Sequence, residues 1–396
     1  HILIHNSDRS LWNTNYTLHS YGDLDKYEIY FKHAIEEVQR DPVFGYTKFN
    51  RAMIHIYEQF LESNVLTDLR KYKYDMLITD IPNYISKFLK RELSIPNSMF
   101  LSPPCVPNLF YEDFELNSSY IPSIGTPFTE RMNFFERFLN SVYIFGIKFL
   151  FEIFKHQQIE VFRRYGYEMD SQLFTKDYFI MLQCPLGISF NLPLPPNFVK
   201  LNAITPRESN KLTDVQLDSF LSRHKKNVYL SQGTIMNVID INEIIHLFNE
   251  LPEYGFILSF KGEAYKGIEF PKNVLLVTWV NQNDLLGDDR LTAFISHCGI
   301  NSVMEALYHE KAVIGLGLAL DQLNTCAYLK EKKFGIAIMN RKDVTTKNLV
   351  NAIRNVETDY IRQNIKKYSK ILKVIMILEK YSITGYNMDL ILNMSI

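Results

Sequence analysis

Between positions 279 and 322, the chain gathers side chains that can bind a negatively charged, hydroxyl-rich ligand. An indole and an imidazole are present, at Trp279 and His297. Carboxylate and amide groups, each able to hold two neighbouring hydroxyls, accompany them. These groups belong to Gln282, Asn301, Glu305, Asp321 and Gln322. The set as a whole is suited to a sugar nucleotide.

The segment from 292 to 302 supplies the elements that would position these side chains. An apolar run over 292–296 predicts a strand, the polar residues 297–301 predict a tight turn, and a helix is expected to begin at Ser302. The first backbone N–H groups of a helix have no partner within it, and together with the helix dipole they attract anions. We therefore expect a phosphate-binding turn here.

Each of these residues also has an interpretation that needs no ligand. Ser302 and Glu305 have the spacing of a capping box. A single Trp279 is more often a packing residue, and a single His297 is more often a hydrogen-bonded loop residue. One at a time, most of these residues favour a structural role, whereas their order and spacing favour a ligand.

That order resembles the signature of the UDP-glycosyltransferases, the family of UDP-glucuronosyl and UDP-glucosyl transferases. The family pattern is W-x-P-Q, then [ST]-H-G-G-x-N-S, a Glu three residues after the Ser, and a final D-Q. The matching positions are Trp279, Gln282, Ser296, His297, Gly299, Asn301, Ser302, Glu305, Asp321 and Gln322. The chain departs from the pattern at Asn281 and Gly317 (usually Pro), at Cys298 (usually Gly), and over 310–312.

The resemblance implies a role for each matched group. Trp279 would stack on uracil, and Gln282 and Glu305 would bind the ribose hydroxyls. Asp321 and Gln322 would hold the sugar. The diphosphate would be bound without a metal by His297 and the backbone at Gly299, Asn301 and Ser302.

A second turn, at residues 231–234, resembles the family's S-x-G-S turn, whose last residue contacts phosphate. Thr234 is therefore a further candidate for donor binding. An ordinary glycine turn explains the same residues equally well. No cofactor is expected, because the UDP-sugar is itself the donor substrate.

The cysteines show no metal-ligand spacing. All four are interpreted as mostly buried thiols, although one disulfide is not excluded: Cys105, Cys184, Cys298 and Cys326. Cys298 adds a side chain where the backbone would approach a phosphate, and the position is expected to need a φ angle that cysteine adopts less readily than glycine.

Length and charge limit the classes of protein. A chain of 396 residues predicts two domains. With 43 basic and 44 acidic residues, the chain has no electrostatic reason to bind nucleic acid. Neither half has a G-x-G-x-x-G after a strand, which argues against a dinucleotide dehydrogenase.

The first half reads as alternating strands and helices. Helices are expected over 30–40, 52–72 and 83–93, with strands at 1–5, 75–80 and 97–102. This alternation predicts a parallel sheet, which binds ligands beyond the C-terminal strand ends. Asp80 stands at such an end.

The resemblance extends to this half and gives Asp80 a candidate catalytic role. Y-D-M-L-I-T-D resembles a family segment whose last Asp is the partner of the catalytic base. A turn or helix-cap aspartate is the structural alternative for Asp80. The strand at residues 1–5 resembles the family's second strand, so the base, a histidine, is expected upstream of residue 1.

The resemblance implies a fold of the GT-B type: two doubly wound, Rossmann-like α/β domains facing across a cleft. Residues 1–200 would form the acceptor-binding domain, residues 201–375 the UDP-sugar-binding domain, and residues 376–396 a helix or tail returning toward the first domain. The prolines between 193 and 206 are interpreted as the interdomain linker.

The expected function is inverting transfer of glucose or glucuronic acid from UDP to a hydroxyl of a small lipophilic acceptor. A catalytically inactive binding relative is the alternative, and an epimerase is disfavoured by Trp279, Gln282 and the final D-Q. Ser119–Pro122 resembles the animal-type S-Y-[VI]-P segment. That branch lies on the lumenal side of the endoplasmic reticulum membrane, so membrane association is expected only of a full-length form. Sequons at Asn15 and Asn117 agree with this location.

Overall fold

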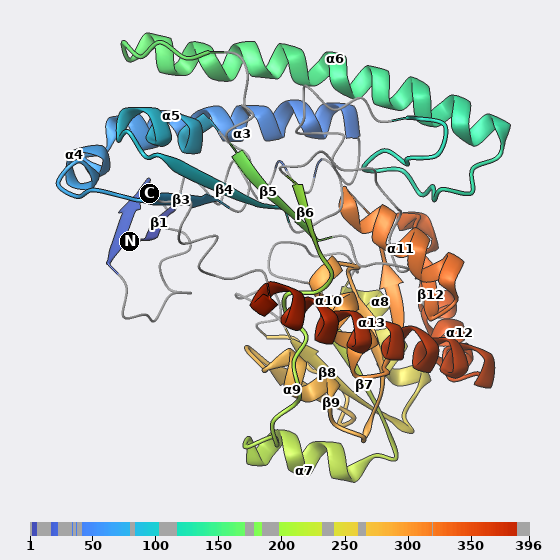
Figure 1. The fold of residues 1–396 in the computed structure, drawn as a ribbon. Helices are drawn as coiled ribbons and strands as arrows, with labels where there is room; N and C mark the ends of the chain where they lie inside the picture. The colour runs from blue at the N-terminus through green and yellow to red at the C-terminus, as the bar shows by residue number, and fades with distance from the viewer. Residues whose placement is uncertain are drawn as a thin grey trace.

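The computed structural model describes residues 2–5, 17–22, 34, 37, 42–79, 84–102, 117–170, 178–183, 198–231, 241–259, 267–318 and 320–385. Within these residues the chain forms two α/β bodies, each built on a parallel sheet (Figure 1). The prediction of an α/β fold with parallel sheets is confirmed. Helix α11 and the loop after residue 117 join the two bodies.

The C-terminal body is built on a six-stranded parallel sheet in the order β12-β11-β10-β7-β8-β9. Its strands read as continuous apolar runs because helices cover both faces of such a sheet. The strands are β7 (Lys226–Ser231), β8 (Tyr254–Ser259), β9 (Val274–Val277), β10 (Leu291–Ser296), β11 (Ala312–Leu316) and β12 (Gly335–Ile338). The helices are α7 (Val215–Arg223), α8 (Ile241–Glu250), α9 (Gln282–Leu286), α10 (Ile300–Tyr308), α11 (Asp321–Lys332), α12 (Thr346–Asn355) and α13 (Asp359–Gly385).

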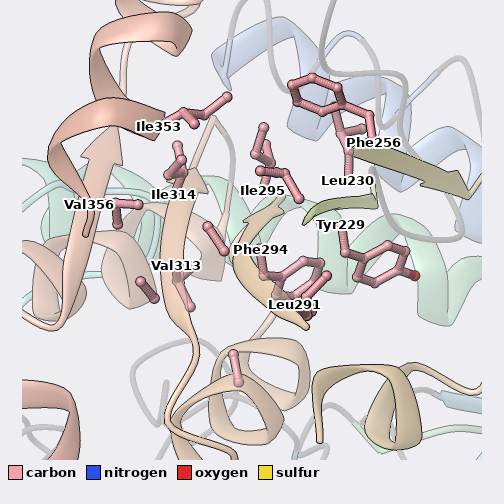
Figure 2. Packing of buried hydrophobic residues seen from close by; sticks show 14 of the residues in the cluster. Tyr229, Leu230, Phe256, Leu291, Phe294, Ile295, Val313, Ile314, Ile353 and Val356 are labelled. Carbon is pink, nitrogen blue, oxygen red and sulfur yellow. The ribbon is translucent and has the colours of Figure 1, made fainter. Parts of the chain in front are cut away.

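A single apolar core fixes these strands at their central positions. Leu230, Phe294 and Ile314 come from three adjacent strands, and each is fully buried (Figure 2). The rings of Tyr229 and Phe294 stack with centroids 5.0 Å apart. Ile353 of α12 packs into the same cluster. This packing makes the sheet a rigid base for the turns at its C-terminal edge.

The N-terminal body has a four-stranded parallel sheet, in the order β3-β4-β5-β6, and a separate parallel pair, β1-β2. Helices α3 and α6 lie side by side above the larger sheet (Figure 1). The strands are β1 (Ile2–His5), β2 (Leu18–Tyr21), β3 (Met76–Thr79), β4 (Asn97–Ser102), β5 (Tyr178–Gln183) and β6 (Phe198–Leu201). The helices are α3 (Pro42–Glu62), α4 (Val65–Leu69), α5 (Tyr84–Glu92) and α6 (Phe134–Arg164).

Three expectations for this half need correction. The apolar run inside the expected linker is strand β6, which pairs with β5. The apolar residues of the strand expected over 75–80 predict that it is buried, but this strand, β3, leaves Ile78 56% exposed, because it is the last strand on that side of the described sheet. The helix expected over 52–72 is two helices, α3 and α4, separated at Ser63 and Asn64. The helix expected over 30–40 lies mostly outside the described residues.

Helix α6 is long and carries an apolar face toward solvent. Asn133 caps its N-terminus in a capping box with Glu136. Large side chains at helical spacing remain more than half exposed, among them Phe134, Phe138, Phe145 and Phe149. No helix in the described part of the chain is long and apolar enough to span a membrane.

Asn140 of α6 organises the loop that reaches the other body. Its side chain accepts from Ser123 N at 2.8 Å and donates to the carbonyls of Ser118 and Ile121, both at 2.8 Å. Across the boundary, Asn324 of α11 donates to Ser123 O at 2.9 Å and accepts from Gly125 N at 3.1 Å. Helix α11 is therefore the element of the C-terminal body that docks on this loop.

Candidate functional site

The turn between β10 and α10 has an uncapped helix N-terminus. Helix α10 begins at Ile300, two residues earlier than expected, and its N-cap is Gly299. No side chain caps this end, and its first turn holds no acidic residue. The first N–H groups of a helix that lacks a side-chain cap can accept an anion.

The capping-box interpretation of Ser302 and Glu305 is wrong. Both side chains instead bind Gln282, the first residue of α9. Gln282 Nε2 donates to Glu305 Oε2 at 2.7 Å and to Ser302 Oγ at 3.1 Å. Two helices thus join an amide, a carboxylate and a hydroxyl into one cluster beside the turn.

Trp279 does not act as a packing residue. Its side chain is 75% exposed, although it lies only three positions before the partly buried cluster partner Gln282. An exposed indole next to a fixed polar cluster can stack on a planar ring.

His297 lies half-buried in the turn, and one of its ring nitrogens can bind a ligand. Its Nδ1 is buried and finds no hydrogen-bond partner among the residues that the structure describes, and the same holds for Asn301 Oδ1. Burial lowers the pKa of His297 to about 4, despite a backbone hydrogen bond with Ser231. The imidazole is therefore neutral at pH 7. Buried polar atoms without partners call for an explanation, and a bound ligand supplies one here.

Cys298, between His297 and Gly299, is in a disulfide with Cys326 of α11. The two Cα atoms are 5.8 Å apart, and both residues are fully buried. Burial is as expected at both positions, but they form the one disulfide that the sequence left open and are not free thiols. The φ of Cys298 is +66°, as the sequence led us to expect. Cys105 and Cys184 lie outside the described residues.

Helix α11 begins at Asp321, directly after Leu320, whose φ is +50°. Burial raises the pKa of the Asp321 carboxyl to about 6. Gln322 follows it and is buried. Asp321 and Gln322 therefore occupy the first turn of the helix that the disulfide ties to the His297 turn.

Tyr46 of the N-terminal body lies within the electrostatic range of Asp321. Burial, a hydrogen bond with Tyr143 and the charge of Asp321 together raise the pKa of Tyr46 well above its usual value. Burial also raises the pKa of Tyr143, so both phenols of this hydrogen-bonded pair are neutral at pH 7. No sequence pattern indicates this pair, because the two tyrosines are 97 positions apart.

The structure brings most of the expected site residues to the C-terminal edge of the six-stranded sheet. Asp80 and Thr234 lie outside the described residues. Ser231, which ends β7, is paired in register with Ser296, which ends β10. The chain therefore leaves these two neighbouring strands at the same level.

Acid is expected to destabilise the fold between about pH 6.5 and 4. Burial lowers the pKa values of His297 and His309 to about 4, below the value of about 6.5 for an exposed histidine. The unfolded chain then binds more protons, so stability is complete above pH 6.5 and is lost as the pH falls. The raised pKa of Asp321 has the opposite effect on stability below about pH 6, because the folded chain then binds the additional proton. This is one group, against the two histidines.

Chemical unfolding of the ligand-free protein at a series of pH values checks this prediction. His309→Gln should reduce the loss of stability, and Asp321→Asn should increase it. A flat profile from pH 7 to 4.5 would contradict the prediction.

The chain is similar in sequence to known proteins of one family. A family model described as "UDP-glucoronosyl and UDP-glucosyl transferase" matches residues 6–375. UDP-glucuronosyltransferase 2B17 of Homo sapiens is 24% identical over 319 residues, which cover 78% of this chain and 60% of the relative. The 2-hydroxyacylsphingosine 1-beta-galactosyltransferase of Homo sapiens is 28% identical over 323 residues, with coverage of 78% and 58%. The chain thus spans about 60% of the length of these relatives.

Solved structures with a similar fold are glycosyltransferases. The glycosyltransferase of kitacinnamycin superposes with a TM-score of 0.55 at 15% identity, covering 82% of this chain and 78% of the other. Os79 from O. sativa, in complex with U2F and trichothecene, gives a TM-score of 0.54 at 13% identity, with coverage of 93% and 87%. At these identities the likeness concerns the fold alone, which is the GT-B arrangement of two Rossmann-like domains.

Proposed function

The chain belongs to the family of UDP-glucuronosyl and UDP-glucosyl transferases, and from this premise we propose that it transfers a hexose from a UDP-sugar to a hydroxyl of a small lipophilic acceptor. The observation that carries the proposal is the cluster of Gln282, Ser302 and Glu305. It is assembled beside an exposed indole and an uncapped helix N-terminus. A purely structural cluster gives no reason for the indole to be exposed.

Each part of the donor has a suitable partner in this arrangement. Trp279 stacks on uracil, and Glu305, held by Gln282, accepts from the ribose hydroxyls. Neutral His297 and the backbone from Gly299 to Ser302 donate to the diphosphate, together with Thr234. Since these donors are neutral, the helix N-terminus supplies the electrostatic attraction. As the leaving UDP gains negative charge, the same groups stabilise it.

The sugar and the acceptor meet where the two bodies touch. Asp321 and Gln322 bind the sugar hydroxyls, and glucose and glucuronic acid are the candidate sugars. Asp80 is proposed as the partner of the catalytic base, which removes the acceptor proton as the hydroxyl attacks the anomeric carbon and inverts it. Asp80 directly follows β3, at the end of the strand where ligands bind in such sheets. The phenols of Tyr46 and Tyr143 would face this region from the N-terminal body.

The lumen of the endoplasmic reticulum is the proposed location. A disulfide persists in an oxidising compartment and is rare in the cytosol, and Cys298 and Cys326 form one. The sequon asparagine Asn117 is exposed, as glycosylation requires. Association with the membrane is also part of this proposal. Glycosylation is tested by treating the protein made in the secretory pathway with an N-glycosidase. No change in mass would contradict glycosylation at Asn117 and Asn15.

Titration with UDP is expected to quench the fluorescence of Trp279, because uracil stacks on the indole. Trp279→Ala should weaken UDP binding by about 5- to 100-fold, since stacking of a base on an aromatic side chain contributes about 1–3 kcal/mol. The loss of stability should be small, because the side chain is 75% exposed. Calorimetry with UDP, UDP-glucose and UDP-glucuronic acid then ranks the sugars.

Trp279→Phe is the matched control, because it keeps an aromatic face and removes the emission of Trp279, leaving that of Trp12. It should bind UDP nearly as tightly as the parent chain by calorimetry and give almost no quenching. Folded protein that binds none of the three ligands would overturn the proposed function.

A further inference from the structure

The disulfide between Cys298 and Cys326 joins the two halves of the donor site. Cys298 lies in the turn that carries His297 and Gly299, and Cys326 lies on α11, five residues after Asp321. The turn faces the diphosphate in the proposed function and the start of α11 faces the sugar. A covalent link therefore runs between the two groups of residues that must bind one donor molecule together.

The surrounding chain is shaped to accommodate this link. A Cβ atom on Gly315 would lie 2.3 Å from Cys298 Sγ and 2.6 Å from Cys326 Sγ, so β11 has no room for a side chain there. A Cβ atom on Gly317 would lie 2.5 Å from Gln322 O and 2.7 Å from Cys326 Cβ. The first turn of α11 thus packs directly on the backbone that leaves β11.

The link also stabilises an unfavourable backbone conformation. Cys298 has a φ of +66°, a region that side chains other than glycine, asparagine and aspartate rarely adopt. Its N–H is satisfied by Ser296 Oγ at 3.1 Å. The conformation sets the direction in which the backbone from His297 to Gly299 presents its N–H groups.

The helix that carries Cys326, α11, also contacts the N-terminal body. Asn324, between Asp321 and Cys326, makes both of its hydrogen bonds to the loop at Ser123 and Gly125. Tyr328 donates to Glu130 Oε2 at 3.2 Å. Helix α11 is therefore held on one side by the disulfide and on the other by the loop, and Asp321 is fixed between them.

We propose that the Cys298–Cys326 disulfide is a positioning element of the donor site, which sets the phosphate-binding turn and the sugar-binding end of α11 at the separation that a UDP-sugar requires. The proposal rests on the proposed function. Because both sulfur atoms are fully buried, the link acts as a permanent tie within the site.

The measurement that tests it is the ratio of the dissociation constants for UDP-sugar and UDP. UDP needs only the turn and its neighbours, whereas UDP-sugar needs both halves. In Cys326→Ala and in Cys298→Gly/Cys326→Ala, this ratio should rise about five- to tenfold, a coupling of the usual size between two sites. The double variant gives position 298 a residue that adopts positive φ without strain, so its affinity for UDP alone should stay within about threefold of the parent value.

Leu329→Ala is the control for a general loosening of α11. Leu329 is a fully buried residue of the same helix that does not belong to the disulfide, so the variant should lower the melting temperature and leave the ratio unchanged. The proposal is overturned if the disulfide variants keep the parent ratio, or if Leu329→Ala changes it equally. Failure of the parent chain to bind UDP would instead refute the proposed function, which separates the two results.

Discussion

Asp321→Ala is expected to weaken binding of the UDP-sugar and to lower kcat/KM by about 10²- to 10⁴-fold, because two hydrogen bonds to a charged group contribute about 1.5–3 kcal/mol each. Affinity for UDP should change less than about threefold, since the nucleotide does not reach the first turn of α11 in the proposed arrangement. Burial raises the pKa of Asp321 to about 6. Its contribution should therefore be complete at pH 7.5 and decrease as the pH falls through 6.

Asp321→Asn separates charge from shape. It keeps one acceptor oxygen, so its loss should be smaller than that of the alanine variant and should not depend on pH near 6. Asp80→Asn serves as a contrast: it should lower kcat by about 10²–10⁴-fold, the usual contribution of a positioned base, without changing the affinity for the UDP-sugar. If Asp321→Ala weakens UDP and UDP-sugar equally, the residue does not bind the sugar.

His297→Ala is expected to weaken UDP binding by about 10- to 100-fold. A hydrogen bond to a charged group contributes about 1.5–3 kcal/mol, and the neutral imidazole of His297 donates to the diphosphate in the proposed arrangement. His297→Gln places an amide N–H near the position of the ring nitrogen and should recover part of the affinity. Calorimetry on both variants gives the two values.

Unfolding of the ligand-free variants supplies the control for the His297 prediction, because the ring is half-buried and its removal also leaves a cavity. UDP affinity equal to that of the parent chain in a folded His297→Ala protein would show that the turn binds no phosphate. The glutamine variant must then also match the parent.

The sequence predicted the C-terminal sheet well because its strands are buried on both faces. Apolar runs at 312–316 and 335–338 predict strands that agree with β11 and β12 residue for residue. The strands expected at 227–231, 255–259 and 292–296 each begin one residue later than β7, β8 and β10. Short or atypical elements were harder to predict. Helix α9 has five residues, and β6 follows a run of prolines that indicated a linker.

The candidate site was predictable in its residues and not in its contacts. Ser302 and Glu305 have the spacing of a capping box, and only the fold brings Gln282 to them. The disulfide joins residues 28 positions apart, a separation with no characteristic motif. Tyr46 comes near Asp321 through the docking of two bodies, which no local pattern encodes.

Gly317 constrains the routes by which this sequence could have diverged from the family pattern. The pattern has proline at this position, and even a single added carbon there would lie 2.7 Å from Cys326 Cβ and 2.5 Å from Gln322 O. The proline and the present placement of α11 therefore exclude each other. Restoring the family's proline by Gly317→Pro would therefore require the first turn of α11, which begins with Asp321, to move away from the end of β11.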